Sequence, residues 1–347
     1  MSIKFITTFV ILIISLCGIV FLSLCLGSYH IPVTKVAYLF IGGDKGDDIT
    51  AKRVVFDMRL KRVLTAVTVG AVLGVSGAAM QSVLRNPLAS PFTLGVQHAA
   101  ALGAAIAIMA LYGGAIGRFS LEVKSPFLVS SLAFLGAVVQ TLFVVSLSHL
   151  VGVSAYAVVL ISIAMAFLVQ ALLSLLQYLF LNEVVVAALL FWTFGDVSRA
   201  SWYELGIMVV VALLVIGILM RFSFDMDLLL TGDELAQSSG VKVKRCRLVV
   251  LLVCALATAV VVSFVGVIGF VGLIGGQMAR LLVGWANRRV IPISALLGGA
   301  VLSVSDLLGR TILSPTVIPV GIMTSLVGVP LLIYLLWEGK HAQGARG

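Results

Sequence analysis

Residues 231–247, TGDELAQSSGVKVKRCR, form the one long polar interruption in the second half of an otherwise apolar chain. Thr231 and Glu234 have the T-x-x-E spacing of a capping box, which predicts that a short helix begins here. Gly240 is expected to end that helix. Five cations flank the segment: Arg221, Lys242, Lys244, Arg245 and Arg247. The pattern alone leaves two interpretations open, an ordinary solvated loop or a helix that a partner protein grips.

The composition excludes a soluble globular protein. The chain of 347 residues is 61% hydrophobic and only 11% charged, whereas soluble domains carry roughly 25% charged residues. A helix that spans a bilayer needs about 20 apolar residues, and the chain offers many such runs. We therefore predict an all-α polytopic membrane protein with a single transmembrane domain over residues 1–347. The net charge of +9 is dispersed among loops, which suits membrane lipid headgroups and excludes nucleic acid as a partner.

The apolar runs predict about ten transmembrane helices. They cover about 5–27, 63–84, 92–112, 126–148, 153–181, 205–222, 248–265, a shorter returning helix that ends near Trp285, 290–308 and 320–337. Residues 248–279 carry no charge and would form one helix of about 48 Å, too long for a hydrocarbon core of about 30 Å. Glycines between Gly266 and Gly276 are therefore expected to break it. The small residues in 63–84 predict a central helix, and residues 182–204 receive no span.

Ten spans place both ends of the chain on one side of the membrane. Lysine and arginine are divided almost evenly between the two sets of loops, so the positive-inside rule does not decide the orientation. Either the topology is inverted or the arginines of the outer loops have a function. Asp306 and Arg310 are one helical turn apart and are expected to form an ion pair. The alternative is that Arg310 faces outward toward an acidic partner.

Enzyme chemistry finds little support in the motifs. The chain has no G-x-x-x-x-G-K-[ST] loop for nucleotide phosphates, no H-E-x-x-H motif and no cluster of Cys and His residues. We expect no bound metal, no cofactor and no catalytic residue. A secondary transporter that uses an ion gradient is an alternative function, but it would need carboxylates in the middle of its spans. Every Asp and Glu here lies near a predicted helix end or in a loop.

Three runs of sequence carry a family resemblance. RNPLASPFTLGV (85–96), GDELAQSSGV (232–241) and GVIGFVGLIGGQMARLLVG (266–284) together resemble the FecCD-type family of ATP-binding cassette (ABC) permeases. The resemblance covers about residues 5–338, in the same order and spacing. That family imports iron–siderophore complexes, haem and vitamin B12. The resemblance implies a type II ABC importer permease fold in the cytoplasmic (inner) membrane of a bacterium or archaeon.

The partners follow from the same resemblance. They are a second permease subunit (identical or paralogous), an ABC ATPase subunit that uses ATP, and a periplasmic or lipid-anchored solute-binding protein. The ATPase would seat a coupling segment at about 228–246, with these residues: Thr231, Gly232, Asp233, Glu234, Leu235, Ala236 and Gly240. The binding protein would dock on three arginines: Arg59, Arg62 and Arg310. Two inner turns would form gate elements of the translocation path: Asn86, Pro87 and Leu88 in one, Gly152 and Ser154 in the other.

The chain departs from the family pattern at two places that bear on these roles. Lys61 stands where the family usually has proline, before the second predicted span. Gly276 and Gln277 replace a common Pro-His pair. None of these substitutions removes a charge that the implied mechanism needs. The sequence names neither the cargo nor the identity of the second permease subunit.

Overall fold

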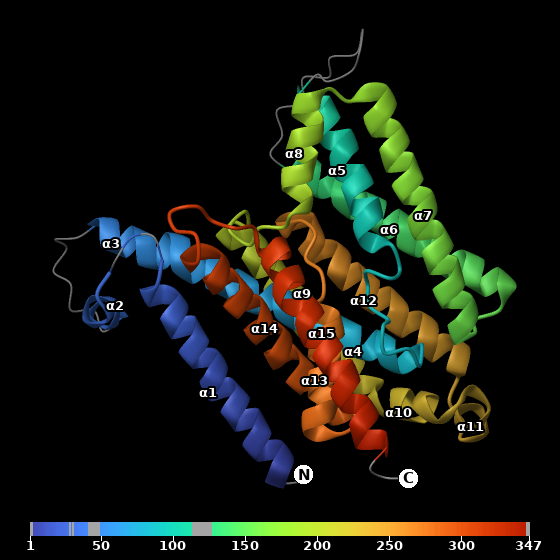
Figure 1. Cartoon of the computed structure of the whole chain (residues 1–347). Helices are drawn as coiled ribbons and strands as arrows, with labels where there is room; N and C mark the ends of the chain where they lie inside the picture. The colour runs from blue at the N-terminus through green and yellow to red at the C-terminus, as the bar shows by residue number, and fades with distance from the viewer. Residues whose placement is uncertain (1–2, 28, 30, 41–48, 113–126, 345–347) are drawn as a thin grey trace.

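The computed structural model describes residues 3–27, 29, 31–40, 49–112 and 127–344, and these ranges are helices joined by turns (Figure 1). In chain order they are α1 (Ile3–Cys25), α2 (Val33–Phe40), α3 (Ile49–Arg53), a π-helical segment (Val54–Leu60), α4 (Lys61–Val83), α5 (Val96–Tyr112), α6 (Leu128–Val151), α7 (Ala155–Phe180), α8 (Glu183–Thr193), α9 (Trp202–Arg221), α10 (Ser223–Thr231), α11 (Asp233–Ser238), α12 (Val243–Val265), α13 (Val271–Val283), α14 (Asn287–Thr311) and α15 (Val320–Gly344).

Seven helical segments of the described chain are long and apolar enough to span a membrane. They are α1, the continuous segment 49–83, α6, α7, α9, α12 and α14; α5, α8, α13 and α15 are shorter apolar helices. Each of the ten predicted spans coincides with one of these helices, in the predicted order. The all-helical membrane fold is therefore confirmed.

Two features of the helices differ from the sequence-based expectation. α8 lies in residues 182–204, to which the hydropathy pattern assigned no helix; its N-cap is Asn182, whose Oδ1 accepts a hydrogen bond from the Val185 N–H at 2.9 Å. The second span begins earlier than expected, because the helix continues from Ile49 through Lys61 into α4 without a break. The backbone N–H of Lys61 donates to Met58 O, a bond that a proline at this position could not make.

The break in the long uncharged run is confirmed. Gly266, with φ of +80°, ends α12, and its N–H donates to Val262 O at 2.8 Å. The chain then turns through Phe270, which itself has a positive φ of +65°, and α13 starts at Val271. The uncharged run thus becomes two helices with a turn between them, as the length of the run requires.

α4 is the central helix, as its small residues predict. In the most apolar window of the segment 49–83, 78% of residues are buried inside the protein, against 6% in α1. The α4 backbone contacts α13 and α14 directly: a Cβ added to Gly77 would lie 2.0 Å from Gly272 O, and one added to Gly70 would lie 2.3 Å from Gly298 O. Glycines at these positions therefore permit a packing distance that no other residue allows.

The remaining helices form a second group. α5, α6, α7 and α8 pack mainly against one another, and α12 contacts both α6 and α4. Figure 1 shows α10 and α11 at the same end of the bundle as the start of α1 and the end of α15. The predicted placement of both chain ends on one side agrees with this arrangement, and the polar segment around residue 231 shares that side.

Candidate functional site

The polar segment that interrupts the second half of the chain folds as two short helices, not as one capped helix. Thr231 is the last residue of α10, and its hydroxyl donates to Leu228 O at 2.8 Å. Gly232, with φ of +131°, occupies the N-cap position of α11, and no side chain caps that helix. The predicted capping box of Thr231 and Glu234 is therefore wrong, because Thr231 lies one residue too early in the chain to be the N-cap.

The predicted end of this helix is confirmed. Gly240 has φ of +87°, and its N–H donates to Gln237 O at 3.0 Å. The next N–H, of Val241, donates to Ala236 O at 3.0 Å. These two bonds constitute a Schellman motif, and the buried side chains of Ala236 and Val241 occupy the positions of its usual hydrophobic contact.

α11 presents one face to the exterior and one to the bundle. Leu235 is 60% exposed, and Glu234 and Gln237 are exposed beside it. Ala236 is completely buried, while Asp233 is half-buried and paired with arginines. Of the residues predicted for coupling, Glu234 and Leu235 can therefore touch a partner directly, whereas Asp233 and Ala236 attach the helix to its own chain.

Asp233 has two cationic partners. Its Oδ1 accepts a hydrogen bond from Nη2 of Arg247 at 2.8 Å and lies 3.5 Å from Nη2 of Arg85. The hydrogen bond from Arg247 lowers the pKa of Asp233, against the opposing effect of burial, and the charge of Arg85 lowers it further. The sequence analysis grouped Arg247 with the flanking loop cations. The burial of Arg247 has one sequence signal: this arginine directly precedes the uncharged run 248–279, where a cation must find partners within the protein.

The two predicted gate turns lie beside this pair. In the first, Asn86 Oδ1 accepts from the Leu88 N–H at 2.9 Å, which is an Asx-turn. Pro87 O accepts from Nε2 of Gln277 in α13 at 3.0 Å, so the glutamine that departs from the family pattern holds this turn. In the second, Gly152 ends α6 with φ of +109° and Ser154 caps α7, accepting from the Ala157 N–H at 3.1 Å.

A cavity of about 620 Å³ lies next to the first gate turn. The α4–α5 connection contributes Ser90 and Thr93, α8 contributes Thr193, and α15 contributes Ser325. The remaining wall is largely apolar and includes Phe270 from the turn between α12 and α13; no charged side chain lines the cavity. The Ser90 hydroxyl has no hydrogen-bond partner among the described residues. The cavity can therefore contact a cargo through hydroxyl groups and apolar surface, without a fixed charge.

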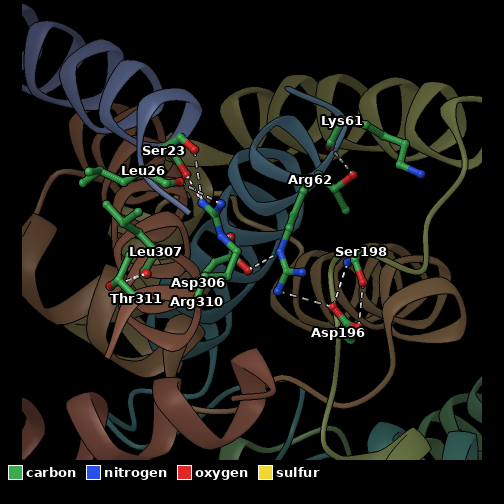
Figure 2. Close-up of polar contacts among 11 residues, drawn as sticks. Ser23, Leu26, Lys61, Arg62, Asp196, Ser198, Asp306, Leu307, Arg310 and Thr311 are labelled. Carbon is green, nitrogen blue, oxygen red and sulfur yellow. Dashed lines mark hydrogen bonds and ion pairs between the residues drawn. The ribbon is translucent and has the colours of Figure 1, made fainter. Parts of the chain in front are cut away.

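Three arginines and two aspartates meet where α4 begins and α14 ends, and Figure 2 shows Asp306 between Arg62 and Arg310. Asp306 Oδ1 accepts from Nε of Arg62 at 2.8 Å, and its Oδ2 accepts from Nε of Arg310 at 3.1 Å. Arg62 also reaches Asp196, in the loop between α8 and α9, at 3.7 Å. The predicted ion pair of Asp306 and Arg310 is confirmed.

These arginines point into the bundle. Arg59 is 6% exposed and donates to Leu24 O at 2.7 Å and Cys25 O at 3.0 Å, at the end of α1. Arg310 is 7% exposed, and its Nη2 donates to the hydroxyl of Ser23 at 2.5 Å. The alternative of an outward-facing Arg310 does not hold in this arrangement, because Asp306 and α1 occupy its donors. The docking role of the three arginines stays a prediction.

These features define a class of protein: a multi-pass membrane subunit with a short exposed helix at the end that holds both chain termini. The chain belongs to the FecCD transport family, whose profile matches residues 11–338. It is the permease subunit of an ABC importer, and the family resemblance read from the three sequence runs is confirmed. The comparisons give no support to the secondary transporter.

Curated relatives match nearly the whole chain. MJ0087 of Methanocaldococcus jannaschii, described as a candidate ABC transporter permease, is 41% identical over 94% of this chain and 93% of its own. The cobalamin import system permease BtuC of Halobacterium salinarum is 36% identical over 83% of this chain and 74% of its own. The Fe(3+)-citrate import system permease YfmE of Bacillus subtilis is 30% identical over 91% and 90%.

Two solved structures share the fold. An inward-facing conformation of a candidate metal-chelate type ABC transporter superposes with a TM-score of 0.80 at 28% identity, over 96% of this chain and 99% of that chain. PsaBC of Streptococcus pneumoniae superposes with a TM-score of 0.56 at 17% identity, over 82% and 93%, and this likeness concerns the fold alone.

Proposed function

We propose that this permease moves a metal chelate of the iron–siderophore type across the cytoplasmic membrane of a bacterium or archaeon. A solute-binding protein delivers the chelate, a second permease subunit completes the path, and a separate ATPase supplies the energy. The relatives named for Fe(3+)-citrate and for cobalamin support this class of cargo. Vitamin B12 and haem are the second candidates for the cargo. A relative named for molybdate import, MolB of Haemophilus influenzae, makes a small oxyanion a further candidate.

One observation carries the proposal: α11 projects Glu234 and the 60% exposed Leu235 from the end of the bundle that holds both chain ends. An exposed leucine with polar neighbours suits a groove in a soluble subunit, because its burial there gains roughly 1.5–3 kcal/mol. The chain itself contributes no nucleotide-binding loop. We therefore assign ATP hydrolysis to the partner and no cofactor to this chain.

The uncharged cavity fits the role of path wall in this proposal. Its volume of about 620 Å³ lies in the usual range for small-molecule sites, about 300–1,000 Å³. A cargo that must pass on needs contacts that are weak and numerous, and hydroxyl groups on an apolar wall provide them. Specificity then belongs mainly to the solute-binding protein.

Docking of the solute-binding protein on Arg59, Arg62 and Arg310 also belongs to this proposal. Acidic residues of the partner must compete with Asp306 for Arg62 and Arg310, and with the carbonyl groups at the end of α1 for Arg59. The exposed Lys52 on the neighbouring helix α3 offers a first contact that requires no such exchange. Charge pairs at such a surface mainly set the register and rate of docking.

Reconstituted transport tests the proposal. The chain is purified with its ATPase and binding protein and placed in proteoliposomes, and uptake of radioactive ferric citrate, ferrichrome and cyanocobalamin is measured. We expect uptake of an iron chelate that requires ATP and survives collapse of the proton gradient by an ionophore. If uptake stopped when the proton gradient was collapsed while ATP was still present, the ABC mechanism would be refuted. If cyanocobalamin were the only compound taken up, the proposal that the cargo is an iron chelate would be refuted.

A variant pair tests the exposed helix. Leu235→Arg should abolish copurification of the ATPase, because a charge would replace the apolar contact. Leu313→Arg is the matched control: Leu313 is 58% exposed, in the turn between α14 and α15. This control should retain the ATPase. Equal ATPase retention by both variants would contradict the coupling role of α11.

A further inference from the structure

Arg247 lies in the first turns of α12 and is completely buried. Its guanidinium group donates three hydrogen bonds to three separate segments. Nε donates to Val83 O at 3.0 Å, Nη1 to Val153 O at 2.6 Å, and Nη2 to Asp233 Oδ1 at 2.8 Å. Val83 ends α4, Val153 lies between α6 and α7, and Asp233 begins α11. A single side chain therefore joins α11 to the starts of both predicted gate turns.

The choice of arginine follows from this geometry. A guanidinium group carries five N–H donors in a planar fork, so it can bond acceptors in three directions at once. A lysine ammonium has the same charge at a single atom on a flexible stem and cannot reproduce the fork. The cost of burying this charge is offset by the carboxylate of Asp233 and the two carbonyl groups.

We propose that Arg247 is the positioning residue that makes α11 and the two gate turns, residues 86–88 and 152–154, move as one unit when the ATPase binds ATP. The inference rests on the proposed coupling role of α11. Arg85 supplies a second, weaker tie to the same carboxylate, at 3.5 Å and with 42% of its side chain exposed. In the part of the chain that the structure describes, the hydrogen bonds that join α11 to residues 152–154 pass through Arg247.

Other contacts of the region do not replace this connection. Asp227 of α10 accepts from the backbone N–H of Asn287 at 2.7 Å and from its Nδ2 at 2.8 Å. These bonds attach α10 to the start of α14, so they support the segment that precedes α11 without reaching either gate turn. Loss of Arg247 should therefore leave the coupling segment folded while it separates α11 from the second gate turn and leaves the ion pair of Arg85 beside the first.

Cysteine accessibility in the reconstituted complex tests the inference without knowledge of the cargo. Val151, 71% exposed at the end of α6 directly before the second gate turn, is replaced by cysteine in a Cys17→Ser background. The rate of reaction with a membrane-impermeant maleimide is compared between nucleotide-free and ATP–vanadate states. Arg247→Lys retains the charge and removes the three-way bond. Arg245→Lys is the matched control, because Arg245 is exposed two residues away.

We expect ATP–vanadate to change the labelling rate in the parent and in Arg245→Lys. In Arg247→Lys the ratio of the two rates should fall to one, while ATPase association and ATP hydrolysis persist. If the ratio of labelling rates in Arg247→Lys equalled that of the parent, the inference would be refuted. If Arg247→Lys lost ATP hydrolysis together with the labelling response, Arg247 would have a purely structural role and the inference would also be refuted. A parent complex that fails to bind the ATPase would refute the proposed function itself.

A second variant keeps the inference testable if Arg247→Lys does not fold. Asp233→Ala removes the contacts of both Arg247 and Arg85 with α11 and leaves both carbonyl bonds of Arg247 in place. Asp233 is 34% exposed, so the change leaves no fully buried vacancy. We expect the same loss of the labelling response with hydrolysis retained. A normal response in Asp233→Ala would show that α11 reaches the gate by another route and would overturn the inference.

Discussion

Replacement of Asp306 by asparagine removes the one carboxylate that two buried arginines share. Asp306 is 1% exposed and pairs with Arg62 at 2.8 Å and with Arg310 at 3.1 Å. Asparagine keeps the size of the side chain and removes its charge, so both guanidinium groups lose their main counter-ion. Among the described residues, Asp196, 3.7 Å from Arg62, is the carboxylate that remains paired with one of them. Breaking a buried pair by removing one partner costs about 3–5 kcal/mol, or roughly 10²- to 10⁴-fold in the folding equilibrium.

Equilibrium unfolding in mixed micelles measures this cost. Sodium dodecyl sulfate is titrated against the purified protein, tryptophan fluorescence reports unfolding, and the free energies of wild type and Asp306→Asn are compared. Asp57→Asn, at an exposed aspartate near the same end of the bundle, is the control and should change the free energy by less than about 0.5 kcal/mol. A loss below about 1 kcal/mol in Asp306→Asn would refute the reasoning, since a paired buried charge cannot lose its partner at that cost.

A double-mutant cycle then isolates the pair. Arg310→Gln alone removes one of the two charges that Asp306 neutralises. If the two side chains interact directly, the loss in the Asp306→Asn, Arg310→Gln double variant should be smaller than the sum of the single losses by about 0.5–3 kcal/mol. Strict additivity would show that the contact contributes no coupling energy.

Three further predictions concern the close helix packing and the short exposed helix. Gly298→Ala would place a Cβ 2.1 Å from a carbonyl oxygen of α4 and should cost about 1–3 kcal/mol in the same titration, whereas Gly217→Ala, with open space around it, should be neutral or stabilising. The pKa of Asp233 is lowered in the folded protein, so its contribution to stability is complete above its ordinary pKa of about 3.9 and is lost as pH falls through the lowered value. The difference in unfolding free energy between wild type and Asp233→Asn should therefore be constant near neutral pH and shrink only in strong acid; a difference that varies between pH 6 and 8 would contradict it. Gly240→Ala, at φ of +87°, should cost about 1–2 kcal/mol and speed amide exchange in α11; unchanged exchange would refute the role of Gly240 in ending the helix.

The helices could be predicted from hydropathy because each long apolar run has one stable conformation in lipid. The same argument located the break near Gly266, since 32 uncharged residues exceed one bilayer. It failed for α8, whose 11 residues are too short for a hydropathy window and whose cap, Asn182, is the only local signal. Hydropathy also missed the helical stretch that precedes α4, because polar residues before Arg62 are compatible with either a loop or a helix.

The candidate site was predictable in position but not in detail. The T-x-x-E spacing located α11, yet spacing cannot show which residue takes the N-cap conformation when a glycine follows the threonine. The burial of individual charged side chains could not be predicted from the sequence. Arg247 and Arg245 are two residues apart in one cationic run, and only packing against α4 and α6 makes the first completely buried and leaves the second exposed. The pairing of Arg62 with Asp306, 244 positions apart, is likewise a product of the tertiary fold.

Where Gly70 crosses Gly298 and Gly77 crosses Gly272, α4 contacts α14 and α13 backbone against backbone, with no side chain between them that could change rotamer. Such an interface has no alternative arrangement of similar energy, because any separation opens a gap and any approach produces a clash. These three helices must therefore shift as a rigid body during the transport cycle. The change of shape that admits and releases cargo is then left to movements between this three-helix unit and the helices around it.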